Sequence, residues 1–369
     1  MAQEFHQDCL ELAARRIREG RVDRRTVLGA LAALGLAPLG GRDAAAQGTR
    51  ELVMVNWGGV ANQGFQNFYG EPFMRTNAGW RVVQDSSGPS AGRIKGMVDS
   101  GRVTWDLCDS SASSSRVLAS QNAVRTIDYG IVQKSDSIDP GFVLEHGAAP
   151  YSFSSVLAYD SSKFPTAPAS WADFWDLRRF PGTRLLRRDA LATLDAAQMA
   201  LGKDPANLYP IDLRAALGKI REIRRNSVYW NNGSESEQFM RTGEAVMGMI
   251  WHTRATVLER ETNGRIKFTW AQGLLQAGIF VIPRNNPGGE MAQRLLASML
   301  ANPEPQVELL KFLGNGPTNP RAAALVPQDF RRVNPTDPGN ARQQVVLNGT
   351  WWGDNYTQAN ADMLDIVTG

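Results

Sequence analysis

Cysteine and histidine are scarce in this sequence, and their scarcity argues against several classes of protein. The 369 residues contain two cysteines, Cys9 and Cys108, and three histidines. Because Cys9 lies in an N-terminal segment with the features of a cleaved signal, Cys108 would have no partner for an intramolecular disulfide. The patterns HExxH, CxxC and GxxxxGKS or GxxxxGKT do not occur. The sequence therefore gives little support to zinc, haem or P-loop chemistry, and we expect no cofactor.

Long apolar runs are also missing. The run from Val27 to Leu39 is diluted by glycine and proline, and it is shorter than the ~20 residues of a membrane-spanning helix. Arg24-Arg25 precedes it and Ala44-Ala45-Ala46 follows it, which is the order of regions in an export signal. We therefore predict that residues 1–46 form a twin-arginine signal, cleaved near Ala46/Gln47, and that the mature protein lies in the periplasm. A buried amphipathic N-terminal helix is the alternative.

An excess of charge of one sign is absent as well. The chain has 40 Lys and Arg against 37 Asp and Glu, a net charge of +3. Because no long basic stretch accompanies this small excess, the composition argues against nucleic-acid binding. The chain that remains after residue 46 is longer than a single core usually supports, so we expect two lobes and a monomer.

Short apolar runs alternate with helical patterns at the start of the mature chain. Strands are predicted for residues 51–57, 80–85 and 103–109, and helices for the segment with Phe65, Phe68, Tyr69 and Phe73 and for residues 91–101. This alternation indicates parallel βαβ units. Ligands of such sheets gather at the carboxyl ends of the strands. Trp57 and the serine-rich run that begins at Asp109 lie at two of these ends.

The rest of the chain predicts a second unit of the same kind. Residues 154–165 predict a strand that leaves the first unit, and the proline-bearing segment 166–176 predicts the entry to another lobe. The further expected elements are a helix over 212–223, a helix that starts near Ser234, a turn at Gly243, a buried strand that ends at Trp251, strands at 266–272 and 278–287, and two helices divided at Asn302-Pro303.

Six short motifs occur along this chain in an order that is typical of one protein family. They are VNWGG, WDLCDSS, FMRTGEAVMGMIWHTR, FVIPRNNP, GPTNPRAAALVP and VVLNGTWWGDN, spread over residues 51–356. Together they resemble the periplasmic solute-binding proteins of ABC importers, in particular the spermidine/putrescine-binding type. The resemblance implies an α/β, two-lobed type II periplasmic binding protein fold, in which each lobe is a mostly parallel sheet flanked by helices. It also implies a small ligand held between the lobes, hinge closure, and a partner in the ABC permease of the inner membrane.

The same resemblance suggests how the chain is divided. Lobe one would hold residues 51–157 and lobe two residues 158–278. Residues 279–369 would return to lobe one, with C-terminal helices that pack across both lobes.

The resemblance also points to candidate ligand contacts. Trp57 and Trp251 match aromatic residues of the family's cleft, Ser111 matches a cleft serine, and Ser234 matches a polar residue at the head of a lobe-two helix. A tryptophan face attracts a cation by ~0.5–2 kcal/mol, although core packing for the tryptophans and turn formation for Ser111 are the alternatives. The full candidate set is Trp57, Gly58, Ser110, Ser111, Asp195, Ser234, Trp251, His252, Arg254 and Gln276.

Several acids of the polyamine binders are missing. Gly59 replaces the acid two residues beyond the first tryptophan, Gln276 and Gly278 replace a tryptophan and an aspartate, and of an acidic pair only Asp195 remains, with Ala192 at the other position. A buried ammonium without a partner costs several kcal/mol, more than two tryptophan faces return. A two-ended polyamine therefore fits this sequence poorly.

Basic residues lie where acids might have been. They are Arg184, Arg187, Arg188, His252 and Arg254. An arginine fork suits a carboxylate or a phosphate, whereas a solvated face or a salt bridge to Asp189 is the alternative. The expected ligand is a small organic solute, either an amine with one cationic end or a carboxylate-bearing compound.

Two other functions remain open from sequence. One is an exported serine hydrolase, with Ser110 or Ser111 as nucleophile and His146 or His252 as base, although no GxSxG motif frames the serines. The other is a sensor subunit of the same fold that reports its bound ligand to a membrane receptor.

Overall fold

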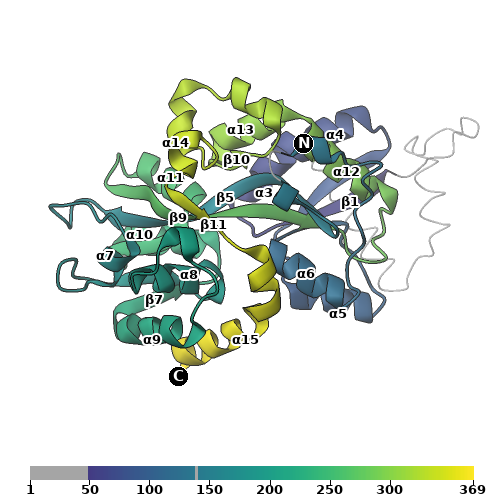
Figure 1. Cartoon of the computed structure of the whole chain (residues 1–369). Coiled ribbons are helices and arrows are strands. Elements are labelled where there is room, and N and C mark those ends of the chain that lie inside the picture. The colour runs from purple at the N-terminus through teal and green to yellow at the C-terminus, as the bar shows by residue number, and fades with distance from the viewer. Residues whose placement is uncertain (1–48, 138–139) are drawn as a thin grey trace, which may run out of the picture. The chain divides into compact units, whose positions relative to one another are not determined.

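A mixed β-sheet runs through the described part of the chain (Figure 1). The computed structural model describes residues 49–137 and 140–369, so the predicted export signal at 1–46 lies outside the described residues. The strand order is β2-β1-β3-β9-β5-β8-β6-β7, and β4, β10 and β11 pair alongside β5 or β9. The strands are β1 Arg50–Val55, β2 Trp80–Asp85, β3 Leu107–Ser110, β4 Val143–Leu144, β5 Gly147–Asp160, β6 Arg184–Arg187, β7 Ser227–Trp230, β8 Met247–Trp251, β9 Ile266–Val281, β10 Gly316–Pro317 and β11 Gln344–Val346.

The two ends of this sheet are parallel and its middle is antiparallel. β1 pairs in parallel with β2 and β3, and β6 pairs in parallel with β7 and β8. Between them, β5 and β9 pair antiparallel with each other. β9 also pairs antiparallel with β3, and β5 pairs antiparallel with β8. We call the β1–β3 side the first half and the β6–β8 side the second half. The predicted mostly parallel sheets flanked by helices are confirmed.

The helices cover both halves of the sheet. They are α3 Val60–Phe65, α4 Glu71–Thr76, α5 Ala91–Asp99, α6 Ala112–Ser120, α7 Trp171–Trp175, α8 Ala190–Ala200, α9 Leu213–Ile223, α10 Gly233–Thr242, α11 His252–Glu261, α12 Glu290–Ala301, α13 Pro303–Leu313, α14 Pro338–Ala341 and α15 Gly349–Thr368. Several begin where the sequence offers a polar cap: the side chains of Ser90, Ser111 and Asp212 accept backbone N–H groups of the first turns of α5, α6 and α9. Among these described residues, no helix combines the length and the apolar character of a membrane span.

Each half has its own apolar core. In the first half, Phe65, Phe73 and Leu107 pack with residues of α12 and α13 from much later in the chain. In the second half, one core contains the buried face of α9, with Leu217, Ile220 and Ile223, and also Trp352 of α15. The C-terminal helix α15 packs on α6 of the first half and on α8 and α9 of the second.

The strand β9 differs from the expectation. Two strands were expected at 266–272 and 278–287, but one continuous strand crosses from the second half to the first. Its pairing with β5 shifts register between Ser155↔Leu274 and Leu157↔Thr269, so several residues of β9 bulge opposite one residue of β5. Gln272 lies in this bulge with φ of 57°, and its backbone carbonyl accepts the indole N–H of Trp171. Because the bulge interrupts the alternation of apolar and polar residues, the hydrophobic pattern alone does not show that the strand is continuous.

Candidate functional site

A cavity of about 310 Å³ lies where strands of both halves end. Its lining comes from the loops after β1 and β3, from the ends of β6, β7 and β8, and from the crossing strands β5 and β9. Six of the ten candidate residues line it together: Trp57, Ser110, Ser111, Trp251, Arg254 and Gln276. Carboxyl ends of parallel strands thus meet here from both sides, as expected for a ligand site of an α/β sheet.

Aromatic rings form one wall of this cavity. The Trp251 ring meets the Trp230 ring edge to face at 5.0 Å between centroids, and the Phe153 ring at 6.0 Å. Trp57, from the first half, packs partly buried against the same apolar cluster of the second half. Gly58 does not line the cavity, but its N–H donates to the side chain of Asn56 at 2.9 Å, and its φ of 79° turns the chain beside Trp57.

Arg254 brings a nearly buried positive charge to the cavity. It lies in the first turn of α11 and is 3% exposed, with Nη1 3.3 Å from Glu237 Oε1. A Cβ at position 233 would lie 2.4 Å from Nε, so Gly233 allows this close approach. A Cβ at Gly59 would lie 3.8 Å from Nη2 and 3.1 Å from the Ser234 hydroxyl. Because position 59 is a glycine and not the acid of the polyamine binders, the guanidinium of Arg254 from the opposite half can lie close to it.

Three residues that line the cavity each have a buried polar side-chain atom with no hydrogen-bond partner among the described residues. They are the donors Trp251 Nε1 and Arg254 Nε and the acceptor Asn315 Oδ1. Buried polar groups in proteins are nearly always paired, and an unpaired one costs about 1–3 kcal/mol. The region around the cavity therefore carries an unusual concentration of unpaired polar groups.

A buried carboxyl group also lines the cavity. Asp109 is 3% exposed, and the Tyr151 hydroxyl donates to it at 2.9 Å. Burial raises the pKa of Asp109 to about 7. Burial and the charge of Asp109 raise the pKa of Tyr151, whereas the charge of Arg254 lowers it. The cavity is therefore lined by a buried acid and a buried guanidinium, and Tyr151 is within electrostatic range of both.

Arg187 is a second guanidinium on the cavity wall. Its Cζ lies 5.3 Å from the Trp251 ring centroid and 5.6 Å from that of Trp230. Its Nη2 is 3.3 Å from Asp189 Oδ2, which also accepts from the Tyr356 hydroxyl of α15. Arg188 lines the cavity too, but its side chain is exposed. Arg184 instead is fully buried and donates to the backbone carbonyls of Phe174, Phe180 and Gly182.

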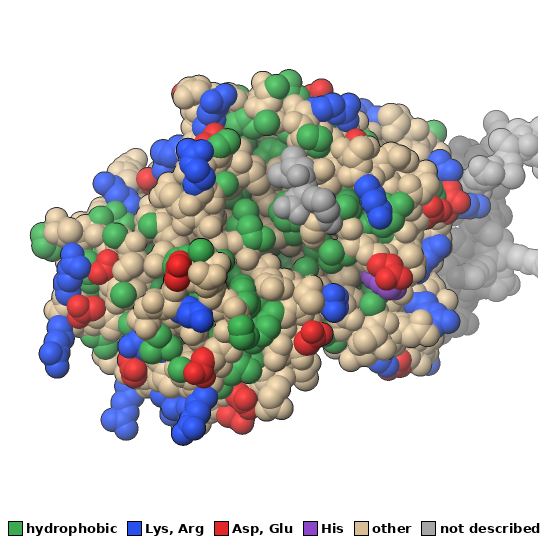
Figure 2. All heavy atoms as spheres, viewed as in Figure 1, with side chains coloured by type: hydrophobic (Ala, Val, Ile, Leu, Met, Phe, Trp, Pro, Cys, Tyr) green, Lys and Arg blue, Asp and Glu red, His purple; other side chains and the backbone are tan. Residues whose placement is uncertain are grey.

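The polar candidates Ser111 and Gln276 already have partners. Ser111 Oγ accepts the backbone N–H of Ser114 at 3.1 Å and bonds to Ser113 Oγ at 3.0 Å. Gln276 donates to Ser155 Oγ at 3.2 Å. Both residues also line a second cavity of about 640 Å³ between α6 and α15. On the face over α6 and α15, apolar side chains gather along the middle and charged ones toward the edges (Figure 2).

Asp195 and Ser234 lie elsewhere than expected. Asp195 is fully buried and accepts from the Tyr209 hydroxyl, from Trp352 Nε1 at 3.2 Å and from the Ala192 N–H at 3.0 Å. It therefore ties α8 to α15 and does not line the 310 Å³ cavity. Ser234 is exposed near the start of α10 and does not line it either.

His252 is a structural residue. Its Nδ1 accepts the backbone N–H of Ser154 at 3.0 Å, and its Nε2 donates to the carbonyl of Gly314 at 2.7 Å. With both ring nitrogens occupied by backbone, His252 has no nitrogen left to activate Ser110 or Ser111 as a general base. The alternative function of a serine hydrolase therefore loses one of its two candidate general bases.

Burial lowers the pKa of His252 to about 4, which makes stability depend on pH. An unfolded histidine takes up a proton near pH 6.5, so the unfolded state gains protons first as the pH falls. We expect this group to reduce the free energy of unfolding by up to about 3 kcal/mol between pH 6.5 and 4, with no change above that range. Urea unfolding of wild type and His252→Gln at pH 7 and pH 4.5 isolates the effect from the acids. Parallel losses in the two proteins would contradict it.

The residues missed from sequence are mainly those of the charged end of the cavity. Asp109, Tyr151, Trp230 and Asn315 line it; Asp109 belongs to the WDLCDSS motif without having been chosen as a contact, and none of the six motifs contains the other three. Among the described residues, no group of three or more His, Cys, Asp or Glu side chains is placed to hold a metal ion.

Comparisons with known proteins show which family the chain is similar to. Residues 69–333 match the family described as bacterial extracellular solute-binding protein. The chain is 29% identical to a gamma-aminobutyric acid-binding protein of Pseudomonas aeruginosa, over 85% of this chain and 90% of that protein. It is 26% identical to the spermidine/putrescine-binding periplasmic protein of Escherichia coli, over 52% and 53%.

A solved structure shows the same fold. The protein AgtB of Agrobacterium tumefaciens R10, in complex with agropinic acid, superposes with a TM-score of 0.79 at 27% identity, covering 87% of this chain and 99% of that one. The chain therefore belongs to the bacterial extracellular solute-binding protein family, whose members are non-enzymatic components of transporters.

Proposed function

We propose that this solute-binding subunit of an ABC transporter captures a small zwitterionic solute, one carboxylate with one ammonium end, in the 310 Å³ cavity. The observation that carries the proposal is that two residues with side-chain donors, Trp251 and the nearly buried Arg254, line the cavity together. A carboxylate accepts from both and brings a charge opposite to that of Arg254. The N-terminus of α11, where no side chain caps the helix, adds a favourable field for an anion.

The other end of the solute would meet the acid. An ammonium group would pair with Asp109 and donate to Asn315 Oδ1, while its methylenes pack on Trp57 and Trp251. A chain of a few methylenes separates such groups in an ω-amino acid. The relative in Pseudomonas aeruginosa named for gamma-aminobutyric acid supports this class, and the agropinic acid complex supports a carboxylate.

A two-ended polyamine has less support. Of the two acids that line the cavity, Asp189 already pairs with Arg187, which leaves Asp109 for an ammonium. A second ammonium would face Arg254 and Arg187. Like charges in a partly buried site repel by several kcal/mol at close range, so a polyamine should bind weakly.

The remaining parts of the proposal concern the whole molecule. Lobe one would comprise residues 51–157 and 279–369, with the C-terminal helices packing across both lobes, and lobe two residues 158–278. The separate apolar cores of the two halves support two lobes, and Trp352 of α15 in the second core supports a helix that packs across both. The lobes would close on the solute and present it to the permease. Export by a signal at residues 1–46 would bring the mature protein, as a monomer, to the periplasm, where an importer collects solutes.

Isothermal titration calorimetry tests the ligand class directly. We expect 4-aminobutyrate and related ω-amino acids to bind with micromolar or tighter affinity, about −8 kcal/mol or more. Putrescine and spermidine should bind at least about 100-fold more weakly. Spermidine binding tighter than every amino acid or carboxylate in the panel would overturn the proposal.

Proton release provides a second readout. Because the pKa of Asp109 is about 7 in the free protein, this carboxyl group is mostly protonated at pH 6.5, and an ammonium beside it lowers that pKa. We expect a net release of protons, by a fraction of one proton for each solute bound at pH 6.5. Titrations in buffers of different ionisation enthalpy measure the number, and Asp109→Asn serves as the control with no release. Proton uptake by the wild type would contradict the assigned ammonium site.

A further inference from the structure

Arg187 is brought together with two tryptophans at the carboxyl ends of three neighbouring strands. It is the last residue of β6, which pairs in parallel with β7 on one side and β8 on the other. Trp230 and Trp251 are the last residues of those two strands, and Arg187 is in register with Trp230. All three residues line the 310 Å³ cavity. The order β8-β6-β7 therefore places one arginine and two indole rings on the same wall.

The guanidinium of Arg187 occupies a position that suits an organic cation. Its Cζ lies over the rings of Trp251 and Trp230, at 5.3 Å and 5.6 Å from their centroids. Its Nη2 lies 3.3 Å from Asp189 Oδ2, and the two side chains are only 15% and 17% exposed. An ammonium group that enters a partly buried site is stabilised by the same two features, an aromatic face and a carboxylate. Arg187 therefore uses the groups that such an ammonium would need.

Asp189 has contacts that would hold it in place without Arg187. Its Oδ1 accepts the backbone N–H of Leu191 at 2.9 Å as the cap of α8, and its Oδ2 accepts the Tyr356 hydroxyl at 3.3 Å. Both donors are neutral, so they leave the charge of the carboxylate unbalanced. Asp189 itself lines the cavity. Removal of the Arg187 guanidinium would therefore leave a free carboxylate and two free indole faces on the cavity wall.

We infer that Arg187 is a specificity-determining residue, which limits the cavity to solutes that carry one ammonium group. This inference rests on the proposed function, in which Asp109 binds that ammonium. The exclusion does not come from net charge, because Arg187 and Asp189 balance each other. It comes from occupation, because the second ammonium of a diamine would lie in a partly buried site whose other acid is already paired.

The affinity for putrescine, a diamine of four carbon atoms, tests this role. In Arg187→Met and in Arg187→Gln we expect calorimetry to show putrescine binding about tenfold more tightly than in wild type, because a carboxylate and two aromatic faces become available. In Arg187→Lys the affinity should stay within about threefold of wild type, since the cation is kept.

A double variant tests whether the freed acid is responsible. In Arg187→Met/Asp189→Asn, asparagine still caps α8 but carries no charge. We expect the double variant to lose most of the gain in putrescine affinity that Arg187→Met produces.

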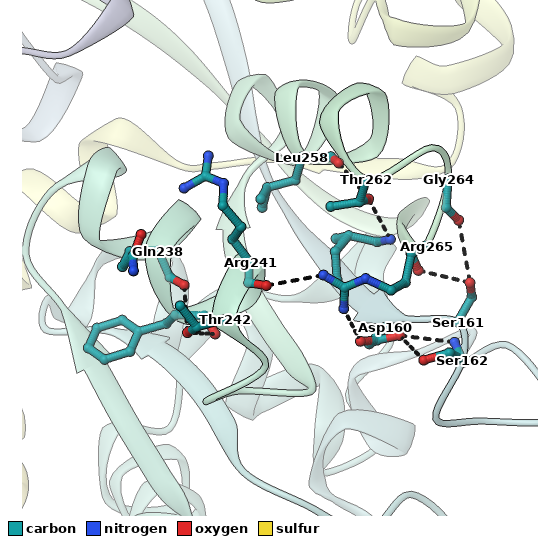
Figure 3. Close-up of polar contacts among 12 residues, drawn as sticks. Asp160, Ser161, Ser162, Gln238, Arg241, Thr242, Leu258, Thr262, Gly264 and Arg265 are labelled. Atoms are coloured by element: carbon teal, nitrogen blue, oxygen red, sulfur yellow. Dashed lines mark hydrogen bonds and ion pairs between the residues drawn. The ribbon is translucent and has the colours of Figure 1, made fainter.

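A second ion pair of arginine and aspartate provides the matched control. Nη1 of Arg265 pairs with the buried Asp160, and Nη2 of Arg265 donates to the backbone carbonyl of Arg241 at 3.1 Å (Figure 3). Ser162 donates to the same carboxylate from its backbone and its hydroxyl. Arg265 and Asp160 do not line the cavity, so Arg265→Met makes the same change in net charge without altering the affinity for putrescine. Thermal unfolding establishes that each variant is folded.

Several results would overturn the inference. One is a putrescine affinity in folded Arg187→Met and Arg187→Gln that equals that of the wild type. Others are the same gain in Arg187→Lys or in Arg265→Met, and a gain that persists in the double variant. A wild type that binds putrescine more tightly than 4-aminobutyrate would be distinguishable, because it would remove the proposed function itself.

Discussion

Replacing Arg254 with glutamine should weaken the binding of 4-aminobutyrate by at least about 100-fold. Arg254 is 3% exposed and lines the cavity, so it brings a poorly screened positive charge to the proposed carboxylate site. The substitution also leaves Glu237 beside the cavity without its buried partner, so a repulsive charge takes the place of an attractive one. Calorimetric titration of the folded variant measures the loss.

Arg260→Gln is the matched control for this experiment. Arg260 lies in the last turn of the same helix α11 and is exposed. The identical substitution there should change affinity by less than about threefold, because a solvated charge at that distance is screened. An Arg254→Gln protein that binds 4-aminobutyrate as the wild type does would show that the carboxylate is held elsewhere.

Replacing Arg184 with methionine should lower the free energy of unfolding by about 3–5 kcal/mol and leave the affinity of the folded protein unchanged. Arg184 has no exposed surface, and its guanidinium satisfies the carbonyls of Phe174, Phe180 and Gly182 around the loop before β6. Methionine fills a similar volume but donates no hydrogen bond, so these buried carbonyls lose their donor.

Urea unfolding at pH 7 measures the loss in Arg184→Met. Arg214→Met, at an exposed position of α9, should change stability by no more than about 0.5 kcal/mol. A stable Arg184→Met protein with reduced affinity would reverse the assignment of roles and make Arg184 part of the binding site. By this assignment Arg184 supports the fold, whereas the proposed role of Arg254 is to bind the solute.

The fold was largely predictable because its signals are local. The alternation of short apolar strands with amphipathic helices, such as the one with Leu217, Ile220 and Ile223, identified parallel units in both halves. The break between α12 and α13 at Asn302-Pro303 also appears where the sequence places it. The length of β9 was missed because the bulge around Gln272 interrupts the alternation on which strand prediction depends.

The candidate site was predictable only in part. Trp57 lies two residues after β1, Ser110 is the last residue of β3 and Trp251 is the last residue of β8. Strand ends and motifs therefore located these three lining residues from sequence. His252 and Asp195 also stand in recognisable motifs, but sequence does not reveal which way a side chain points. Their partners, Gly314 and Trp352, lie far away in the chain.

The acid of the site was missed for a related reason. Asp109 precedes the serines in an ordinary strand end, and its raised pKa depends on burial beside Tyr151 of β5. A pairing between residues from distant strands leaves no trace in either local sequence.

The interruption in the β5–β9 ladder has a mechanical consequence. Hydrogen-bonded pairing is regular from Ile266 to Thr269 on one side of the bulge and from Leu274 to Gly278 on the other. A rotation of the backbone within the bulge would tilt one paired segment against the other without breaking the hydrogen bonds of either segment. The closure of the two halves around a ligand, which we propose, would therefore break few hydrogen bonds between these strands.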